Sequence, residues 1–266
     1  MRECLALLRA AWLTETSYRL NMLFSLASLI FVVVPLYFVA RALQPTMASS
    51  IASQSQQYFA FVLIGSATLT LISASASALP NAVASAIGRG TLEAFLSTPT
   101  HPALLLGGMS AYGVLWAVVR AAILVAAGAV LGVRIAWANA PAILALLALL
   151  IVCYAAFGLI ASAMLLCFRT TGPLLSGLLS LSALLGGVYY PTHVIPSWIQ
   201  QLSNALPLTY GLRALRQSAL LGVPVVRLGH DMAMLAGFAV FLLLIGTLTV
   251  AAALRFAKRA GTLSQY

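Results

Sequence analysis

The residues that could carry acid–base or metal chemistry are few in this chain and widely spaced. Four carboxylates and three histidines occur among its 266 residues. They are Glu3, Glu15, Glu93, Asp231, His101, His193 and His230. This spacing forms neither a nucleophile–base pair nor a set of metal ligands, so we expect a chain without catalysis or a metal site of its own. Cys4, Cys153 and Cys167 lack metal-ligand and disulfide spacing and are interpreted as small packing residues.

The composition is that of a membrane protein. Hydrophobic residues make up 62% of the chain and charged residues only 7%, whereas about a quarter of the residues in a soluble domain are charged. The net charge of +10 would suggest nucleic acid in a soluble protein. Here the basic residues lie mostly at the ends of apolar runs, where they set orientation and meet anionic lipid, so we expect no nucleic-acid binding.

The apolar runs predict an all-α protein with six transmembrane helices in a single transmembrane domain, residues 1–266, because several runs exceed about 18 residues. The predicted spans are 22–40, 58–79, 106–131, 141–167, 173–190 and 232–254. Pro35 is expected to kink the first span, and residues 44–57 to form a polar connection.

Residues 1–20 predict an amphipathic helix at the membrane interface, because Leu5, Leu8 and Trp12 share one helical face. The alternative is a signal peptide, since Ala40-Arg41-Ala42 resembles a cleavage site. We favour a retained first span, because its apolar run of about 19 residues is longer than the core of a signal peptide.

Lysine and arginine counts predict that both termini are cytoplasmic, because basic residues concentrate on that side of a membrane. With the N-terminus inside, the cytoplasmic segments carry Arg2, Arg9, Arg19, Arg89, Arg169, Arg255, Lys258 and Arg259. The opposite side carries the smaller set Arg41, Arg134, Arg213, Arg216 and Arg227.

Two connections between spans have unusual sequences. Residues 80–102 predict a short cytoplasmic helix, in which Thr91 caps the start and Glu93 lies in the first turn, where a carboxylate favours the helix dipole. Residues 186–216 contain Pro191, Pro196 and Pro207, which interrupt helices, together with the interface-seeking aromatics Tyr189, Tyr190, Trp198 and Tyr210. We expect a broken hairpin that enters the outer membrane face, acting either as a gate or as an interface anchor. The alternative for the first segment is a solvated loop.

Three arginines are candidate binding residues. Arg120 lies well inside the third predicted span, so it either faces a cavity that receives anionic head groups or snorkels to the inner interface. Arg213 and Arg216 share one face of a predicted outer helix, where they would contact an acidic lipid or glycan or simply anchor the helix among head groups.

The chain resembles the ABC-2 type export permeases over nearly its whole length. One part of the resemblance is Gly90-Thr91-Leu92-Glu93 followed by Leu96-Ser97-Thr98-Pro99. The other is the order of residues in the outer segment: Gly186, Tyr190-Pro191, Ile195-Pro196, Pro207-Leu208-Thr209-Tyr210 and Arg216.

The resemblance implies a transport subunit that exports its cargo with energy from a separate cytoplasmic ABC ATPase, present in two copies. ATP and Mg would be bound by that partner, because this chain has no Gly-x4-Gly-Lys-Ser/Thr phosphate loop. A second permease copy or a paralogue would complete the complex in a bacterial or archaeal inner membrane. The implied ATPase-coupling residues are Arg89, Gly90, Thr91, Leu92 and Glu93. The implied outer gate comprises Tyr190, Pro191, Pro196, Trp198, Pro207 and Tyr210, in a re-entrant helical hairpin.

The main alternative is a secondary carrier driven by an ion gradient. Such carriers usually place acids inside their spans, and none falls clearly inside a span here. A membrane enzyme lacks a catalytic cluster, and the Glu-Ala-Ala motif of ATP-driven importers is not evident at Glu93-Ala94-Phe95. The abundance of small residues is compatible with a drug, a lipid or a lipid-linked glycan, and we favour a hydrophobic or amphiphilic cargo.

Overall fold

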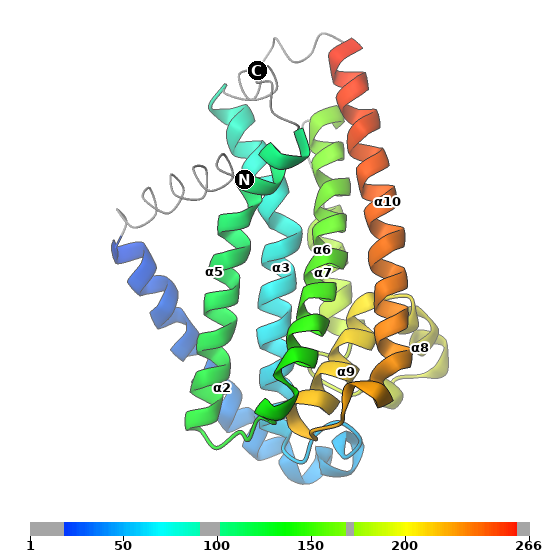
Figure 1. The fold of residues 1–266 in the computed structure, drawn as a ribbon. Coiled ribbons are helices and arrows are strands. Elements are labelled where there is room, and N and C mark those ends of the chain that lie inside the picture. Colours follow the sequence, from blue (N-terminus) through cyan, green and yellow to red (C-terminus); the bar gives the residue numbers. More distant parts are fainter. Residues whose placement is uncertain (1–18, 91–101, 169–172, 260–266) are drawn as a thin grey trace.

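The computed structural model describes residues 19–90, 102–168 and 173–259, and these residues form helices and connecting turns (Figure 1). The long helices are α2 (Arg19–Ile51), α3 (Tyr58–Gly88), α5 (Pro102–Val130), α6 (Ala140–Phe168) and α10 (Gly229–Arg259). The shorter ones are η1 (Trp137–Asn139), α7 (Leu174–Leu185), η2 (Thr192–Val194), α8 (Ser197–Asn204), α9 (Pro207–Leu220) and η3 (Val225–Leu228). The predicted interface helix, up to residue 18, and the predicted cytoplasmic helix from Thr91 onward lie outside the described residues.

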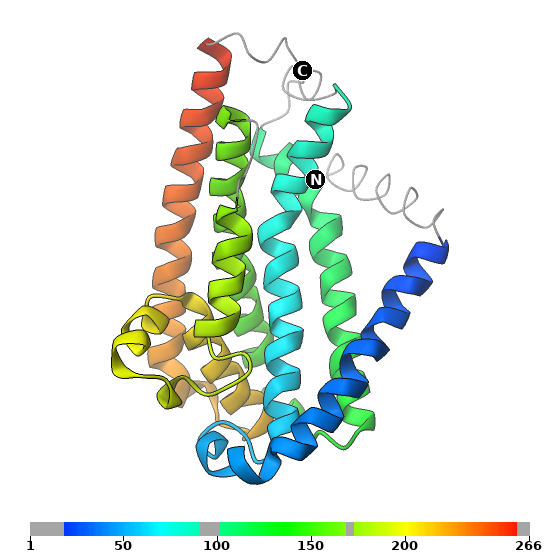
Figure 2. The same cartoon turned by 180° about the vertical axis from the view of Figure 1, so that it is seen from behind.

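The long helices form a bundle with two distinct ends. α3, α5, α6 and α10 stand side by side, while α2 meets α3 near its own C-terminus and diverges toward its start (Figures 1 and 2). One end carries α8, α9 and the α2–α3 turn, and we call it the hairpin end. We call the opposite end of the bundle the far end. The C-terminal ends of α3, α6 and α10 lie there, and α2 begins toward this side (Figure 1). This separation agrees with the predicted alternation of the connections.

Five helices of the described residues are long and apolar enough to cross a membrane. Their apolar spans are Phe31–Ile51, Tyr58–Gly88, Gly113–Val130, Trp137–Phe168 and Val226–Phe256. The predicted fifth span, 173–190, is instead the 12-residue helix α7, whose length of about 18 Å is short of a bilayer core. α7 stops at Gly186 and Gly187, the latter with a left-handed φ of 79°. The chain is therefore a multi-pass membrane protein whose sixth span is not confirmed.

The first predicted span was too short and the polar connection after it too long. α2 continues through Pro45 to Ile51 because its last turns bury apolar side chains against α3, with Ile51 fully buried. The Gln44 side chain accepts a hydrogen bond from the Tyr58 amide at 2.6 Å and donates to the Gln56 carbonyl at 3.2 Å. The Gln44 side chain thus stabilises the α2–α3 turn.

The second predicted span, 58–79, was also too short. α3 passes through Pro80 and ends at Gly88, so residues 80–88 belong to the same helix and not to a loop. The extra turns are held by burial of Val83 and Ala86, both 1% exposed, in a cluster shared with α6 and α10. Proline normally disfavours a helix interior, and here tertiary packing outweighs that cost.

α3 is the central helix, because it contacts α2, α5, α6, α7 and α9. It approaches α6 closely at Gly158, where an added Cβ would lie 2.6 Å from the Ala76 carbonyl oxygen. Small residues permit such backbone contacts between membrane helices. Nearby, the buried Tyr154 hydroxyl donates to the Ser182 hydroxyl oxygen at 2.8 Å, tying α6 to α7.

We predict that Gly158→Ala destabilises the bundle. The new methyl group would force α3 and α6 apart, and overpacking of this kind costs about 1–3 kcal/mol. The measurement is the thermal unfolding midpoint of the purified protein in detergent. Gly177→Ala on α7 is the matched control, because nothing lies within 4 Å of the added Cβ there. An unchanged midpoint for Gly158→Ala would contradict this contact.

Candidate functional site

The candidate site is the segment that joins α7 to α9 at the hairpin end. After Gly187 the chain forms η2 and α8 and then turns into α9, with Pro207 at the first helical position, where its missing amide hydrogen is not needed. Close packing requires glycine at position 186. A Cβ added to Gly186 would lie 2.3 Å from the Ser182 carbonyl oxygen and 2.8 Å from the Leu208 side chain. The predicted broken hairpin is therefore two short helices, α8 and α9.

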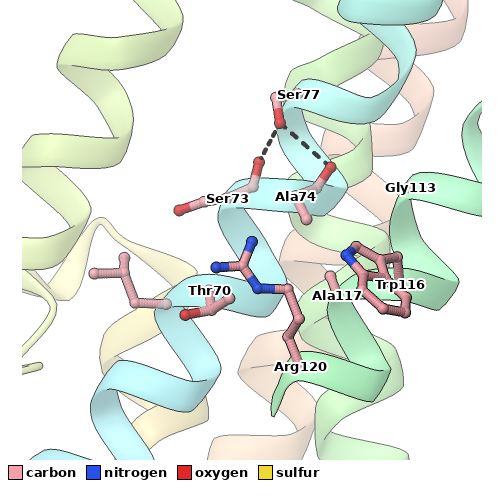
Figure 3. Close-up of a pocket in the computed structure, with 9 residues that line it drawn as sticks. Thr70, Ser73, Ala74, Ser77, Gly113, Trp116, Ala117 and Arg120 are labelled. Atoms are coloured by element: carbon pink, nitrogen blue, oxygen red, sulfur yellow. Dashed lines mark hydrogen bonds between the residues drawn. The ribbon is translucent and has the colours of Figure 1, made fainter. Parts of the chain in front are cut away.

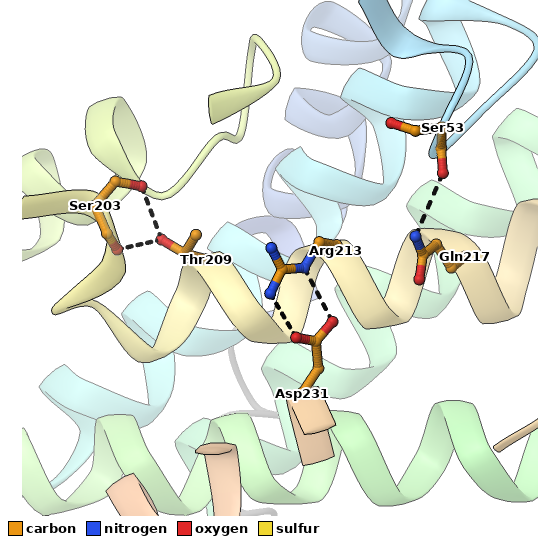
Figure 4. Close-up of polar contacts among 6 residues, drawn as sticks. All are labelled: Ser53, Ser203, Thr209, Arg213, Gln217 and Asp231. Atoms are coloured by element: carbon orange, nitrogen blue, oxygen red, sulfur yellow. Dashed lines mark hydrogen bonds and ion pairs between the residues drawn. The ribbon is translucent and has the colours of Figure 1, made fainter. Parts of the chain in front are cut away.

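Two hydroxyl groups close the corner between α8 and α9 (Figure 4). The Ser203 hydroxyl donates to the Leu185 carbonyl at 2.6 Å, and the Thr209 hydroxyl donates to the Ser203 carbonyl at 2.6 Å. The two hydroxyl oxygens lie 3.1 Å apart. These bonds tie the corner to α7 and to the end of α8, where the Ser203 carbonyl also accepts from the Leu206 amide at 3.1 Å.

Arg216 of α9 holds the hairpin to the rest of the bundle. Its side chain is 1% exposed. Nη1 donates to the Gly187 carbonyl at 2.8 Å and Nη2 to the Val188 carbonyl at 2.9 Å. Nε donates to the Phe61 carbonyl of α3 at 3.1 Å, and Nη1 also contacts the Gln54 side-chain oxygen at 3.3 Å. One guanidinium therefore joins α9, α3, the α2–α3 turn and the hairpin.

The chemistry of this anchor is a buried cation surrounded by neutral acceptors. The guanidinium carbon lies 3.4 Å from the centre of the Phe61 ring, which adds a cation–π contact. Burial lowers the pKa of Arg216 to about 9, which leaves the group protonated at neutral pH. A charged donor makes stronger hydrogen bonds than a neutral one, so the carbonyls compensate its burial without a carboxylate.

Neighbouring contacts leave little room between the hairpin and its anchor. The Tyr58 hydroxyl donates to the Tyr189 carbonyl at 2.8 Å. A Cβ on Gly65 would lie 2.5 Å from the Val188 carbonyl oxygen and 2.6 Å from Arg216, so only glycine fits there. The remaining cavity under the hairpin is about 10 Å³, about the space one water needs. Residues 187–191 are thus packed closely against α9 and α3.

Arg213 ties the same helix to α10. Its Nε and Nη2 donate to the two carboxylate oxygens of Asp231 at 3.0 and 2.5 Å (Figure 4). The hydrogen bond to Asp231 raises the pKa of Arg213. Because Asp231 is the only acidic residue in the described ranges, this is their one salt bridge. The two arginines of α9 therefore hold it on two sides.

The structure gives Arg213 and Arg216 roles that differ from the expected contact with head groups. Arg216 has no accessible donor, and Arg213 is engaged by Asp231. The headgroup interpretation was wrong for Arg216, because a sequence cannot show that backbone carbonyls surround it.

The structure divides the predicted gate residues into two groups. Pro191, Pro207 and Tyr210 are buried inside the hairpin, and Tyr190 is partly buried. Pro196 and Trp198 are exposed, with Trp198 66% exposed on α8.

The other predicted residues lie away from the hairpin. Arg89 and Gly90 follow the far end of α3, where the Arg89 side chain bonds to Ser85. Thr91, Leu92 and Glu93 lie outside the described residues. Arg120 lines a separate cavity between α3 and α5 (Figure 3).

Sequence reasoning missed the partners of the anchor. Gln54 was placed in a loop, Phe61 and Gly65 were treated as ordinary span residues, and Asp231 was not assigned a partner. For Asp231 a signal existed, because a carboxylate at the start of a membrane helix needs a cation. Phe61 contributes its ring and its backbone carbonyl, and the carbonyl leaves no mark in the sequence.

We predict that Arg216→Lys weakens the hairpin. A lysine ammonium cannot reproduce the planar fork that contacts Phe61, Gly187 and Val188 together. Leaving buried acceptors unpaired costs on the order of 3 kcal/mol. The thermal midpoint should fall and proteolytic cleavage within residues 186–206 should accelerate, whereas Arg227→Lys, an exposed arginine in η3, should change neither. Equal behaviour of the two variants would refute the anchor.

Comparison with known proteins gives one family. The family described as ABC-2 type transporter matches residues 2–220. The match ends at the last residue of α9, so it includes the hairpin and Arg216 and leaves α10 outside. No curated protein sequence matches the chain closely enough to be reported as a relative.

Proposed function

Because this chain belongs to the ABC-2 type transporter family, we propose that it is the membrane subunit of an ATP-driven exporter. The family match over residues 2–220 carries the proposal. The structure supports it with long apolar helices and a packed helical hairpin at one end of the bundle. The energy would come from two copies of a separate ABC ATPase, because the sequence contains no phosphate loop.

The permease itself would bind no nucleotide and catalyse no reaction. ATP and Mg would be held by the ATPase subunits, and a second copy of this chain or a paralogue would complete the pathway. The complex would lie in a bacterial or archaeal inner membrane with both termini cytoplasmic. The proposed orientation places the far end of the bundle, where α10 ends, in the cytoplasm and the hairpin end outside.

The proposed coupling element is the segment that follows α3 at the far end. Gly90 adopts a left-handed φ of 65° and turns the chain away from the helix axis. The coupling residues would be Arg89 and Gly90, at the helix end, and Thr91, Leu92 and Glu93, which follow. Glu93 is proposed to contact a lysine or arginine of the ATPase.

α3 provides a mechanical path from this segment to the hairpin. It is continuous from Tyr58 to Gly88, which corresponds to about 46 Å. Near its start, the Phe61 carbonyl accepts the Arg216 hydrogen bond. A displacement of the far end of α3 would therefore be transmitted along one continuous helix to the anchor of α9.

The hairpin is proposed as the outer gate. Its buried residues Pro191, Pro207 and Tyr210 would keep the closed shape. Its exposed residues, such as Trp198 and Leu202 one turn apart on α8, would rest at the outer membrane interface, where tryptophan is favoured. A closed hairpin of this kind would block a hydrophobic or amphiphilic cargo until α3 moves.

We predict ATP-dependent export that does not require an ion gradient. Inside-out vesicles containing this chain and its ATPase should accumulate a fluorescent amphiphile on addition of ATP. Accumulation should persist when an uncoupler dissipates the proton gradient, because hydrolysis supplies the energy. Loss of transport with the uncoupler while ATP remains high would favour the ion-driven carrier instead.

We predict that Glu93→Ala weakens binding of the ATPase and slows export. Removing a charge-assisted hydrogen bond costs about 1.5–3 kcal/mol, which corresponds to roughly a tenfold or greater loss of affinity for the ATPase. The readouts are co-purification of the ATPase and export rate, with membrane insertion unchanged. Glu15→Ala is the matched acidic control and should retain both. If Glu93→Ala exports normally, Glu93 has no coupling role.

A further inference from the structure

A second cavity lies between α3 and α5, away from the hairpin. Its volume is about 460 Å³, within the roughly 300–1,000 Å³ of ligand pockets. α3 contributes Thr70, Ser73 and Ser77, and α5 contributes Trp116 and Arg120 (Figure 3). The cavity therefore combines a cation, hydroxyl groups and an aromatic ring within the membrane-spanning bundle.

Arg120 lies inside an apolar span. It falls within Gly113–Val130, about 15 Å along the helix from Val130 and about 10 Å from Gly113. Its side chain extends across to α3, toward Thr70 and Ser73, and does not run along α5 to the membrane surface (Figure 3). The direction of this side chain favours the cavity interpretation over snorkelling to the inner interface.

Arg120 has no counter-charge among the described residues. Its Nε is buried without a hydrogen-bond partner, and the carboxylate of Asp231 is engaged by Arg213. A second copy of the chain would bring only the same four acids, of which Glu3, Glu15 and Glu93 lie outside the predicted spans. An arginine inside a membrane span requires compensation, and the part of the chain that the structure describes supplies no carboxylate for it.

Two of the four polar groups around Arg120 are hydrogen-bond donors without an acceptor among the described residues. The Thr70 and Ser77 hydroxyls donate to carbonyls of their own helix. Among the described residues, the Ser73 hydroxyl and the Trp116 indole nitrogen make no hydrogen bond, and both line the cavity beside Arg120. Unused donors around an unpaired cation favour an anionic ligand.

We propose that this cavity binds the anionic head group of an amphiphile, a phosphate or a carboxylate. Arg120 is the counter-ion, Ser73 and Trp116 donate hydrogen bonds, and the indole ring with Leu69 contacts the adjoining carbon chain. The head group comes either from the exported cargo or from a resident bilayer lipid. The cargo assignment rests on the proposed export function, whereas binding to the permease does not.

The test is a binding titration of the purified full chain without ATP or ATPase. Native mass spectrometry measures bound dioctanoyl phosphatidic acid against dioctanoylglycerol, which lacks the phosphate. The wild-type protein should bind the anionic compound at least about tenfold more tightly, and Arg120→Gln should remove the preference. Arg134→Gln, an exposed arginine between α5 and α6, should keep it. Equal binding of both compounds, or an unchanged preference in Arg120→Gln, overturns the proposal.

Three further measurements keep the outcome decisive. If Arg120→Gln fails to insert, Ser73→Ala should lower the affinity for phosphatidic acid several-fold, and no change overturns the proposal. If inorganic phosphate competes for the cavity as well as phosphatidic acid does, the proposal that the ligand is an amphiphile is overturned. In the complex with ATPase, stimulation of hydrolysis by phosphatidic acid identifies the head group as that of cargo. Binding without stimulation contradicts the cargo assignment and identifies a bilayer lipid.

Discussion

The fold depends on satisfying backbone carbonyls where the chain is broken between α7 and α9. An unpaired carbonyl away from water is costly, and the break exposes Gly187 and Val188. Arg216 supplies three nitrogen atoms from one rigid group and reaches both carbonyls as well as Phe61 on α3. A single side chain therefore makes an irregular segment compatible with a tightly packed protein.

This anchor makes α3 the element on which the other parts converge. At the hairpin end α3 holds Arg216 through Phe61, and Gly65 lets the Val188 carbonyl approach. Halfway along, its hydroxyl face lines the Arg120 cavity. At the far end it leads into the proposed coupling segment. The three candidate regions are thus attached to one continuous helix.

The sequence predicted those parts of the fold that depend on composition and local chemistry. The range 141–167 matches α6 within a few residues, and the prolines of 186–216 mark the breaks around the short helices α8 and α9. It did not predict that α2 passes Pro45 or that α3 passes Pro80, because burial of Ile51 and Val83 outweighs local propensity. The carbonyl groups that accept from Arg216 could not be predicted from the sequence either, because every residue has a backbone carbonyl.

The hydroxyl groups of α3 have one more consequence. Thr68, Thr70, Ser75 and Ser77 each donate to a carbonyl one turn earlier in α3 itself. Over this stretch their hydrogen bonds travel with the helix, so an axial shift of α3 against α5 or α6 breaks none of them. These hydroxyl groups therefore do not resist an axial shift of α3, and resistance in this region comes from packing, such as the close contact of Ala76 with Gly158. Bonds of this kind also soften a helix toward bending.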